Sequence, residues 1–85
     1  MECFVYILRS LGDGSLYVGH TSDLTRRLAQ HNDPHAKSYT AKRGPWALAY
    51  SEACPDRSTA MARETFLKSC AGAHEKKTLA GPVSD

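Results

Sequence analysis

The fold is decided at the start of the chain, by the stretch CFVYIL at residues 3–8 and by LYV at residues 16–18. The first stretch is short, apolar and rich in β-branched and aromatic residues, which predicts a buried strand. Between the two stretches lies the turn cluster GDGS at residues 12–15, whose glycines readily adopt positive φ. The second stretch then predicts a returning strand that ends at Gly19, so that the two strands form a β-hairpin.

A helix is predicted directly after the hairpin. Either Ser22 or Asp23 can cap its first turn, and Leu24 and Leu28 give it an apolar face. The sequence NDP at residues 32–34 stops it, because proline cannot continue a helix and disfavours helix at the residue before it.

The second half of the chain predicts a third strand and a further helical part. Residues 46–53 alternate as a strand does, and PDRS at residues 55–58 is a helix-start signal with Ser58 as the expected cap. We expect this helix to end at Gly72 and a short last helix to span residues 73–79. The face turned toward the sheet is expected to carry Ala62, Phe66, Leu67 and Cys70.

These elements follow one another in the order β-β-α-β-α-(α), which predicts an α+β fold with a three-stranded antiparallel sheet flanked by helices. A chain of 85 residues has room for a single small core. We therefore expect one domain over residues 1–79 and a flexible tail over residues 80–85.

Composition narrows the class of protein further. The chain has no run of about 20 apolar residues that could span a bilayer and no secretory signal pattern, so we expect a cytoplasmic protein without membrane contact. The three cysteines, Cys3, Cys54 and Cys70, are widely spaced and odd in number. This pattern favours reduced, buried thiols over a disulfide framework or a zinc cluster.

Positive charge gathers in one part of the chain, although the formal net charge is only +2. In the window 26–43 the single acid is Asp33. The cations of this basic segment are Arg26, Arg27, Lys37, Lys42 and Arg43. Such a segment is typical of a surface that binds a phosphate backbone, and equally of a solvated loop, and charge alone leaves both readings open.

Five residues could together carry chemistry. The hairpin can bring the phenols of Tyr6 and Tyr17 together, and Arg27 and His31 share one face of the first helix because they are four residues apart. Glu64 falls at the edge of the second helix's apolar face, where a carboxylate can be partly buried and still reach a cleft. Hydrolysis of a phosphodiester needs such a set: an anchor for a divalent metal, a cation for the phosphate and a proton acceptor for water.

The sequence at these positions resembles the GIY-YIG nuclease superfamily, and is most similar to its compact single-domain bacterial group. FVY at residues 4–6 and YVG at residues 17–19 resemble the paired tripeptides of the superfamily, with both tyrosines kept. YVGHTSDLTRRLAQHN at residues 17–32 resembles its second strand and first helix, and Arg63-Glu64 followed by Lys68 resembles its acidic helix. The resemblance covers residues 2–72.

The resemblance implies a role for each of the five residues. Tyr6 is implied as the general base or as the residue that orients the attacking water, and Tyr17 as a hydrogen-bonding partner in the same site. Arg27 is implied to neutralise the scissile phosphate, and His31 to assist proton transfer or hold the leaving side. Glu64 is implied to coordinate a single Mg²⁺ or Mn²⁺. A free tyrosine titrates near pH ~10, so Tyr6 can act as a base only if its pKa is lowered by the metal or by Arg27.

The resemblance and the basic segment together predict nucleic acid, and DNA in particular, as the partner. The expected contacts are at Gly19, His20, Arg26, Lys37, Lys42, Arg43 and Lys68. The implied function is a metal-dependent DNA endonuclease of low sequence specificity, working in repair or recombination, with a protein partner supplying the targeting. The alternative is a nucleic-acid-binding module of the same fold with little or no turnover.

Overall fold

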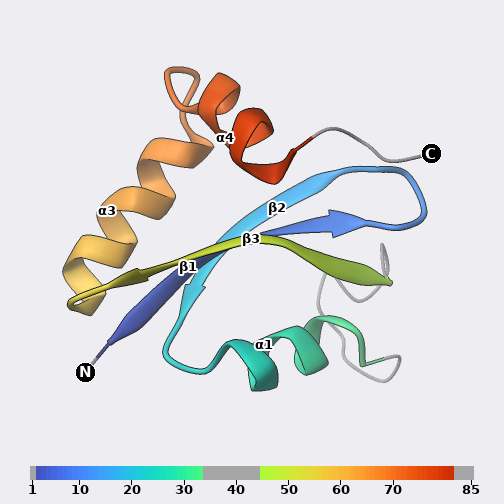
Figure 1. Ribbon diagram of the computed structural model, residues 1–85, viewed down its shortest axis with the longest axis horizontal. Coiled ribbons are helices and arrows are strands. Elements are labelled where there is room, and N and C mark those ends of the chain that lie inside the picture. Colours follow the sequence, from blue (N-terminus) through green and yellow to red (C-terminus); the bar gives the residue numbers. More distant parts are fainter. Residues whose placement is uncertain (1, 34–44, 82–85) are drawn as a thin grey trace.

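The computed structural model describes residues 2–33 and 45–81, and these residues form a three-stranded antiparallel sheet with three helices (Figure 1). The strands are β1 (Cys3–Ser10), β2 (Leu16–Thr21) and β3 (Trp46–Cys54), in the order β2-β1-β3 across the sheet. The helices are α1 (Leu24–His31), α3 (Arg57–Lys68) and α4 (Ala73–Ala80). The predicted α+β class and the predicted order of elements are confirmed.

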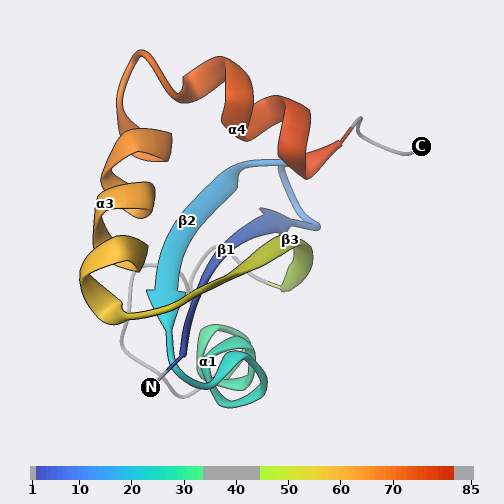
Figure 2. The same cartoon turned by 60° about the vertical axis from the view of Figure 1, so that its left-hand side comes forward.

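The central strand β1 is buried on both faces because helices cover the sheet on both sides. Helix α1 lies against one face, and α3 and α4 lie against the other (Figures 1 and 2). Val5 and Ile7 point toward α3 and α4, whereas Tyr6 and Leu8 belong to the cluster on the α1 side. The apolar run at residues 3–8 is therefore continuous, because successive residues of β1 pack on the two faces of the sheet in turn.

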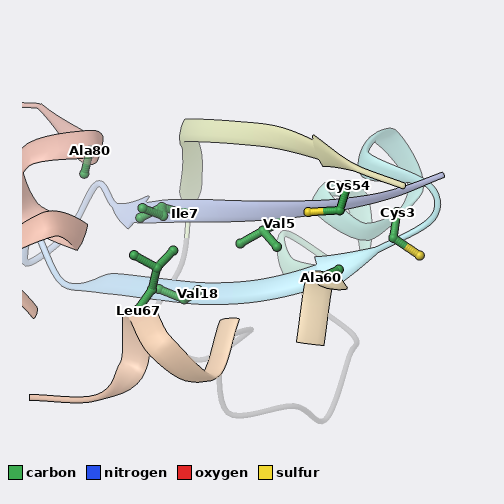
Figure 3. Close-up of a cluster of buried hydrophobic side chains, with 8 residues drawn as sticks. All are labelled: Cys3, Val5, Ile7, Val18, Cys54, Ala60, Leu67 and Ala80. Carbon is green, nitrogen blue, oxygen red and sulfur yellow. The ribbon is translucent and has the colours of Figure 1, made fainter. Parts of the chain in front are cut away.

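The aliphatic core lies between the sheet and the pair α3 and α4 (Figure 3). It consists of Cys3, Val5, Ile7, Val18, Cys54, Ala60, Leu67 and Ala80. Ala60 and Leu67 are the buried residues of α3, and they lie seven residues apart, which is two helical turns. They hold α3 against β1 and β2, so that the part of α3 between Ala60 and Leu67 lies beside the β2 edge of the sheet.

Helix α1 and the start of β3 are joined by the side chain of one residue. Asp23 caps α1 by accepting a hydrogen bond from the amide of Arg26, and the helix ends at Asn32. The Asn32 side chain accepts from the amide of Trp46 at 2.6 Å and donates to its carbonyl at 3.0 Å. This pair of bonds fixes the end of α1, and with it His31, relative to the sheet.

Strand β2 and helix α3 have other bounds than the sequence predicts. Gly19 does not end β2, which continues to Thr21 because the residues after Gly19 still pair with β1. Helix α3 is capped by Asp56, whose side chain accepts from the amide of Thr59, and not by Ser58. It ends at Lys68 and not at Gly72.

The face of α3 that packs on the sheet was also predicted incorrectly. Ala62, Phe66 and Cys70 are exposed, and of the four residues expected there only Leu67 is buried. Ala62 is two residues from Ala60, which places it on the opposite side of the helix. Cys70 follows the end of α3, so its thiol is exposed while the other two cysteines are buried as expected.

The last helix, α4, is confirmed and is one residue longer than predicted. Gly72 precedes it and is buried, and a Cβ at this position would collide with the backbone carbonyl of Phe66. A glycine is therefore required where α3 turns into α4. Ala80, which the sequence assigns to the tail, is the last residue of α4 and part of the core, and residues 82–85 lie outside the described part of the chain. None of the described helices is long and apolar enough to cross a membrane.

Candidate active site

The hydroxyl of Tyr6 is the centre of the candidate active site. It lies 3.0 Å from Nε2 of His31, and Arg27 donates to it from Nε at 3.4 Å. Both partners come from the last two turns of α1, where their spacing of four residues turns them to the same side. The structure therefore brings together three of the five residues predicted to act in catalysis, through direct hydrogen-bond contacts.

Gly19 makes room for the Tyr6 ring. It is the residue directly opposite Tyr6 in the pairing of β1 with β2. A Cβ at position 19 would lie 2.5 Å from Oη and 2.7 Å from Cζ of Tyr6, well inside van der Waals contact. The side chain of Tyr6 thus lies across the bare backbone of β2, and this close approach explains why a glycine is needed here.

Tyr17 lies in the same aromatic group. Its ring centroid is 5.0 Å from that of His31, 6.4 Å from that of Tyr6 and 6.1 Å from that of Trp46. The tilted and edge-on arrangements of these rings are those that aromatic pairs prefer. The expectation that the hairpin brings the two phenols together is met.

Burial sets the protonation of Tyr6 and His31. Desolvation raises the pKa of Tyr6 above its ordinary value of 10.0, and the hydrogen bond from Arg27 only partly offsets this. Desolvation also lowers the pKa of His31 below 6.5, and the charge of Arg27 acts in the same direction. At neutral pH the site therefore holds a protonated phenol, a neutral imidazole and a guanidinium whose pKa is raised by its bond to Tyr6.

Glu64 lies on α3 and is held by two cationic or polar neighbours. Its Oε1 is 2.7 Å from Nδ1 of His20, and its Oε2 accepts from Nζ of Lys68 at 2.9 Å. The carboxylate is partly buried, with 19% of the side chain exposed. Burial alone raises the pKa of Glu64, but the bonds from Lys68 and His20 outweigh burial and the net pKa is lowered. Glu64 is therefore ionised at neutral pH.

The two groups of residues meet at the edge of the sheet formed by β2. Tyr17 and Gly19 face the α1 side of this strand, whereas His20, the next residue, faces α3. The Nζ of Lys68 lies 5.8 Å from the centroid of the Tyr17 ring, so the α3 group reaches round the strand edge. Because β2 is the edge strand, nothing in the sheet separates the two groups.

The residues predicted to contact nucleic acid are only partly described. Gly19, His20 and Lys68 lie within the site, and Arg26 is exposed on α1 next to Arg27. Lys37, Lys42 and Arg43 lie outside the described residues. The basic segment as a whole therefore stays a prediction.

Sequence reasoning missed two pairings of charged residues. It placed His20 among substrate contacts but not beside Glu64, from which it is 44 positions distant. It also grouped Arg63 with the acidic helix motif, whereas Arg63 binds Glu75 through two nitrogens at 3.1 and 3.2 Å and Glu52 at 3.1 Å. Arg63 thus connects α3 to α4 and β3. For His20, the alternation of side chains along the strand was the one sequence signal that could have indicated its orientation toward α3.

A metal site in this region rests on Glu64 alone. Within the described residues there is no group of three or more histidine, cysteine, aspartate or glutamate side chains that could hold an ion. A single ionised carboxylate still suits Mg²⁺, which keeps several waters and is often bound by one carboxylate and the phosphates of the substrate. The Glu64 carboxylate therefore fits a hard cation that is bound together with a phosphodiester. An ion at Oε2 of Glu64 would have to displace Lys68 from that atom.

Comparison with known proteins identifies the family of this chain. A family model described as the GIY-YIG catalytic domain matches residues 2–78, and the chain belongs to this family of nuclease-like domains.

Within the family, the chain is similar to UPF0213 proteins. It is 44% identical over 66 residues to one from Desulfotalea psychrophila, an alignment that covers 76% of this chain and 59% of that relative. It is 36% identical over 77 residues to one from Natronomonas pharaonis, covering 91% and 89% of the two chains. The solution NMR structure of the UPF0213 protein BH0048 from Bacillus halodurans matches with a TM-score of 0.57 and 36% identity, over 96% of this chain and 89% of that one.

Proposed function

We propose that this protein is a metal-dependent endonuclease that hydrolyses phosphodiester bonds in DNA. The observation that carries the proposal is the Tyr6 hydroxyl held between Arg27 and His31, at the same strand edge as an ionised Glu64. The Tyr6 hydroxyl and the His31 imidazole are buried, and the exposed Arg27 guanidinium donates to the same hydroxyl. Hydrolysis of a phosphodiester uses a group that orients water, a proton acceptor and a cation for the phosphate charge, and these three side chains can supply them.

Tyr6 orients the attacking water, and the proton of this water is transferred to His31 through the Tyr6 hydroxyl. Because burial keeps Tyr6 protonated, a tyrosinate base is disfavoured, and of the two roles implied for Tyr6 we retain the orientation of water. As the water oxygen bonds to phosphorus, its proton passes to Oη of Tyr6 while the Tyr6 proton passes to Nε2 of His31. His31 can accept it because burial keeps the imidazole neutral. The bond from phosphorus to the leaving oxygen then breaks, and the leaving alkoxide takes a proton from solvent water.

Arg27 neutralises the charge of the scissile phosphate, and Glu64 is the residue that would hold a divalent ion. Arg27 presents its guanidinium beside Tyr6, and a fixed fork of donors suits phosphate oxygens. A divalent ion bound at Glu64 would supply Lewis-acid stabilisation of the charge on the non-bridging and leaving oxygens. Lys68 neutralises Glu64 until the substrate and ion arrive, and its exposed ammonium group can then bind a phosphate oxygen.

A nicking assay tests the proposal directly. Supercoiled plasmid is incubated with the protein and Mg²⁺ or Mn²⁺, and the relaxed product is measured for the wild type, Glu64→Gln and Glu2→Gln. Glu2 is an exposed carboxylate before β1 and serves as the matched control. We expect nicking by the wild type and by Glu2→Gln and none by Glu64→Gln. Equal nicking by wild type and Glu64→Gln would mean that the activity does not come from this site.

A nucleic-acid-binding module with little or no turnover is the second candidate, and one observation favours it. Both carboxylate oxygens of Glu64 already carry a hydrogen bond, so an ion has to compete with Lys68 and His20. If Lys68 holds its place, the protein binds nucleic acid without cleaving it. In that case the plasmid stays supercoiled with either metal, and binding falls steeply as salt rises.

A further inference from the structure

Two cavities adjoin the candidate active site, one on each side of the end of β2. One of about 200 Å³ is lined by Arg26, Arg27 and Gln30 of α1, together with Asp23, Thr21 and Ser22. The other, of about 570 Å³, is lined by Cys3, Asp56, Arg57 and His20, and again by Thr21 and Ser22. The hollow surface therefore continues across Thr21 and Ser22, and it meets the site through Arg27 on one side and His20 on the other.

Each cavity contains an arginine that is free to bind an anion. Arg26 and Arg57 are exposed, and neither side chain forms a hydrogen bond or an ion pair with any residue in the described part of the chain. Arg63 is different, because its guanidinium is bound by Glu52 and Glu75 and serves the packing of α3. An exposed arginine without a carboxylate partner keeps all its donors for phosphate oxygens.

The acids beside these arginines are engaged in capping helices. Asp23 accepts from the amide of Arg26 at 3.0 Å, and Asp56 accepts from the amide of Thr59 at 2.8 Å. Their negative charges are thus directed at helix N–H groups. Between them Ser22 contributes an exposed hydroxyl group, whereas the Thr21 hydroxyl is bonded to the backbone of Asp23. Serine hydroxyl groups commonly contact phosphate oxygens in protein–DNA interfaces.

We propose that one nucleic-acid strand crosses the end of β2, with its phosphates bound by Arg26 on the α1 side and by Arg57 on the α3 side. Arg57 is then a phosphate-binding residue that belongs to the substrate path although it lies 30 positions away from Arg27 along the chain. The proposal rests on the proposed function in that the same strand presents its scissile phosphate to Arg27. It gives the path of the strand relative to the site, and it predicts that a substrate must extend to both sides of the scissile bond.

Binding measured without divalent metal tests Arg57 separately from catalysis. Fluorescence anisotropy of labelled single-stranded and duplex oligonucleotides is recorded in a chelator over a series of salt concentrations. The variants are Arg57→Ala and, as the matched control, Lys77→Ala, an exposed cation at the last turn of α4. The logarithm of the binding constant falls as the logarithm of the salt concentration rises. Loss of one phosphate contact makes this slope less steep by about 0.7 for a single strand and about 0.9 for duplex DNA.

We expect this loss of slope in Arg57→Ala and none in Lys77→Ala. An unchanged slope in Arg57→Ala, or an equal loss in Lys77→Ala, overturns the inference, since the binding is then elsewhere or spread over the whole surface. Arg57→Lys keeps the charge and should retain most of the slope, and thermal unfolding of each variant checks that the fold is kept.

These measurements distinguish a wrong strand path from a wrong proposed function. If the wild type nicks plasmid in a Glu64-dependent way but Arg57→Ala binds with an unchanged slope, only the strand path is wrong. If no nicking occurs while Arg57→Ala loses slope, the strand path stands and the catalytic proposal fails. Where nicking is observed, Arg57→Ala should raise KM and leave kcat unchanged, because it removes binding away from the reacting atoms.

Discussion

The two faces of β1 are built for different purposes. On the α3 and α4 face, Val5 and Ile7 belong to a core of aliphatic and cysteine side chains that includes Leu67. On the α1 face, the residue between them, Tyr6, is just as buried but shares its surroundings with the imidazole of His31 and the guanidinium of Arg27. One strand thus supplies the centre of the core and the centre of the candidate site on alternate residues.

The difference shows that the residues that stabilise the fold and the residues proposed to act in catalysis lie on opposite faces of the same strand. Burying aliphatic surface stabilises the fold, whereas burying a phenol and an imidazole costs free energy that their hydrogen bonds only offset. Substitutions on the two faces should therefore have opposite signatures. The aliphatic face should lose stability and keep activity per folded molecule, and the Tyr6 face should lose activity first.

Removal of the Tyr6 hydroxyl is the change with the largest expected effect. Tyr6→Phe keeps the ring in place but removes the group that orients water and passes a proton to His31, so the nicking rate should fall about 10²–10⁴-fold. Plasmid nicking with Mg²⁺ or Mn²⁺ measures the rate. Tyr50→Phe is the matched control, because the Tyr50 hydroxyl binds Glu52 and not the site. A Tyr6→Phe protein with the wild-type rate would refute the role given to Tyr6.

Leu67→Ala tests the opposite face. Leu67 is completely buried, and its truncation should lower the free energy of unfolding by about 2–5 kcal/mol. Urea denaturation measures this loss. Leu11→Ala, at an exposed leucine in the hairpin turn, should stay within about 0.5 kcal/mol of the wild type. At a temperature where Leu67→Ala is fully folded, its nicking rate should fall far less than that of Tyr6→Phe, because the cavity can shift Glu64 on α3 but removes no group of the site. A loss as large as that of Tyr6→Phe would mean that the two faces are not separable.

The fold of β1 was predictable because residues 3–8 form a short apolar run, rich in β-branched and aromatic residues and followed by a turn cluster, which favours a buried strand. Strand pairing placed Tyr6 beside Tyr17, helical spacing placed Arg27 and His31 on one face of a helix, and the family resemblance implied that these residues share one site. These are local rules, or pairings across a short turn.

What the sequence did not predict depends on contacts between distant elements. Helix α3 has only a weak apolar face, and alanines occur on both sides of it, so spacing could not distinguish Ala60 from Ala62. The pairing of His20 with Glu64 requires the position of α3 relative to the β2 edge, which is set by Leu67 and Ala60 in the core. The pKa of Tyr6 likewise depends on burial by α1, and burial proved stronger than the effect of Arg27.

Gly19→Ala tests the contact between β2 and the Tyr6 face. The added methyl group would lie 2.5 Å from the Tyr6 hydroxyl, so the ring must shift. We expect a loss of about 1–3 kcal/mol in stability from overpacking and a fall in nicking of about 10²-fold from a displacement near 1 Å. Gly12→Ala is the control, because a Cβ there meets only the Ser10 hydroxyl at an ordinary 3.6 Å. Full activity in Gly19→Ala would show that the close approach is not needed for function.

The smallest effect, and the most specific to the Tyr6 face, is the pH dependence of stability that His31 imposes. Because burial holds the pKa of His31 in the folded protein below its ordinary value of 6.5, the unfolded chain binds more protons as the pH falls through 6.5. Stability should therefore decrease from pH 6.5 down toward the lowered pKa, and be constant with respect to this group above 6.5 and below the lowered value.

Urea unfolding of the wild type, His31→Gln and His74→Gln at a series of pH values between about 5 and 8 isolates this contribution. His74 is an exposed histidine of α4, so His74→Gln should lose stability with falling pH as the wild type does. His31→Gln should lose less. If the pH dependence of His31→Gln equals that of the wild type, His31 is not held neutral by burial, and the proton path from Tyr6 to its Nε2 loses its physical basis.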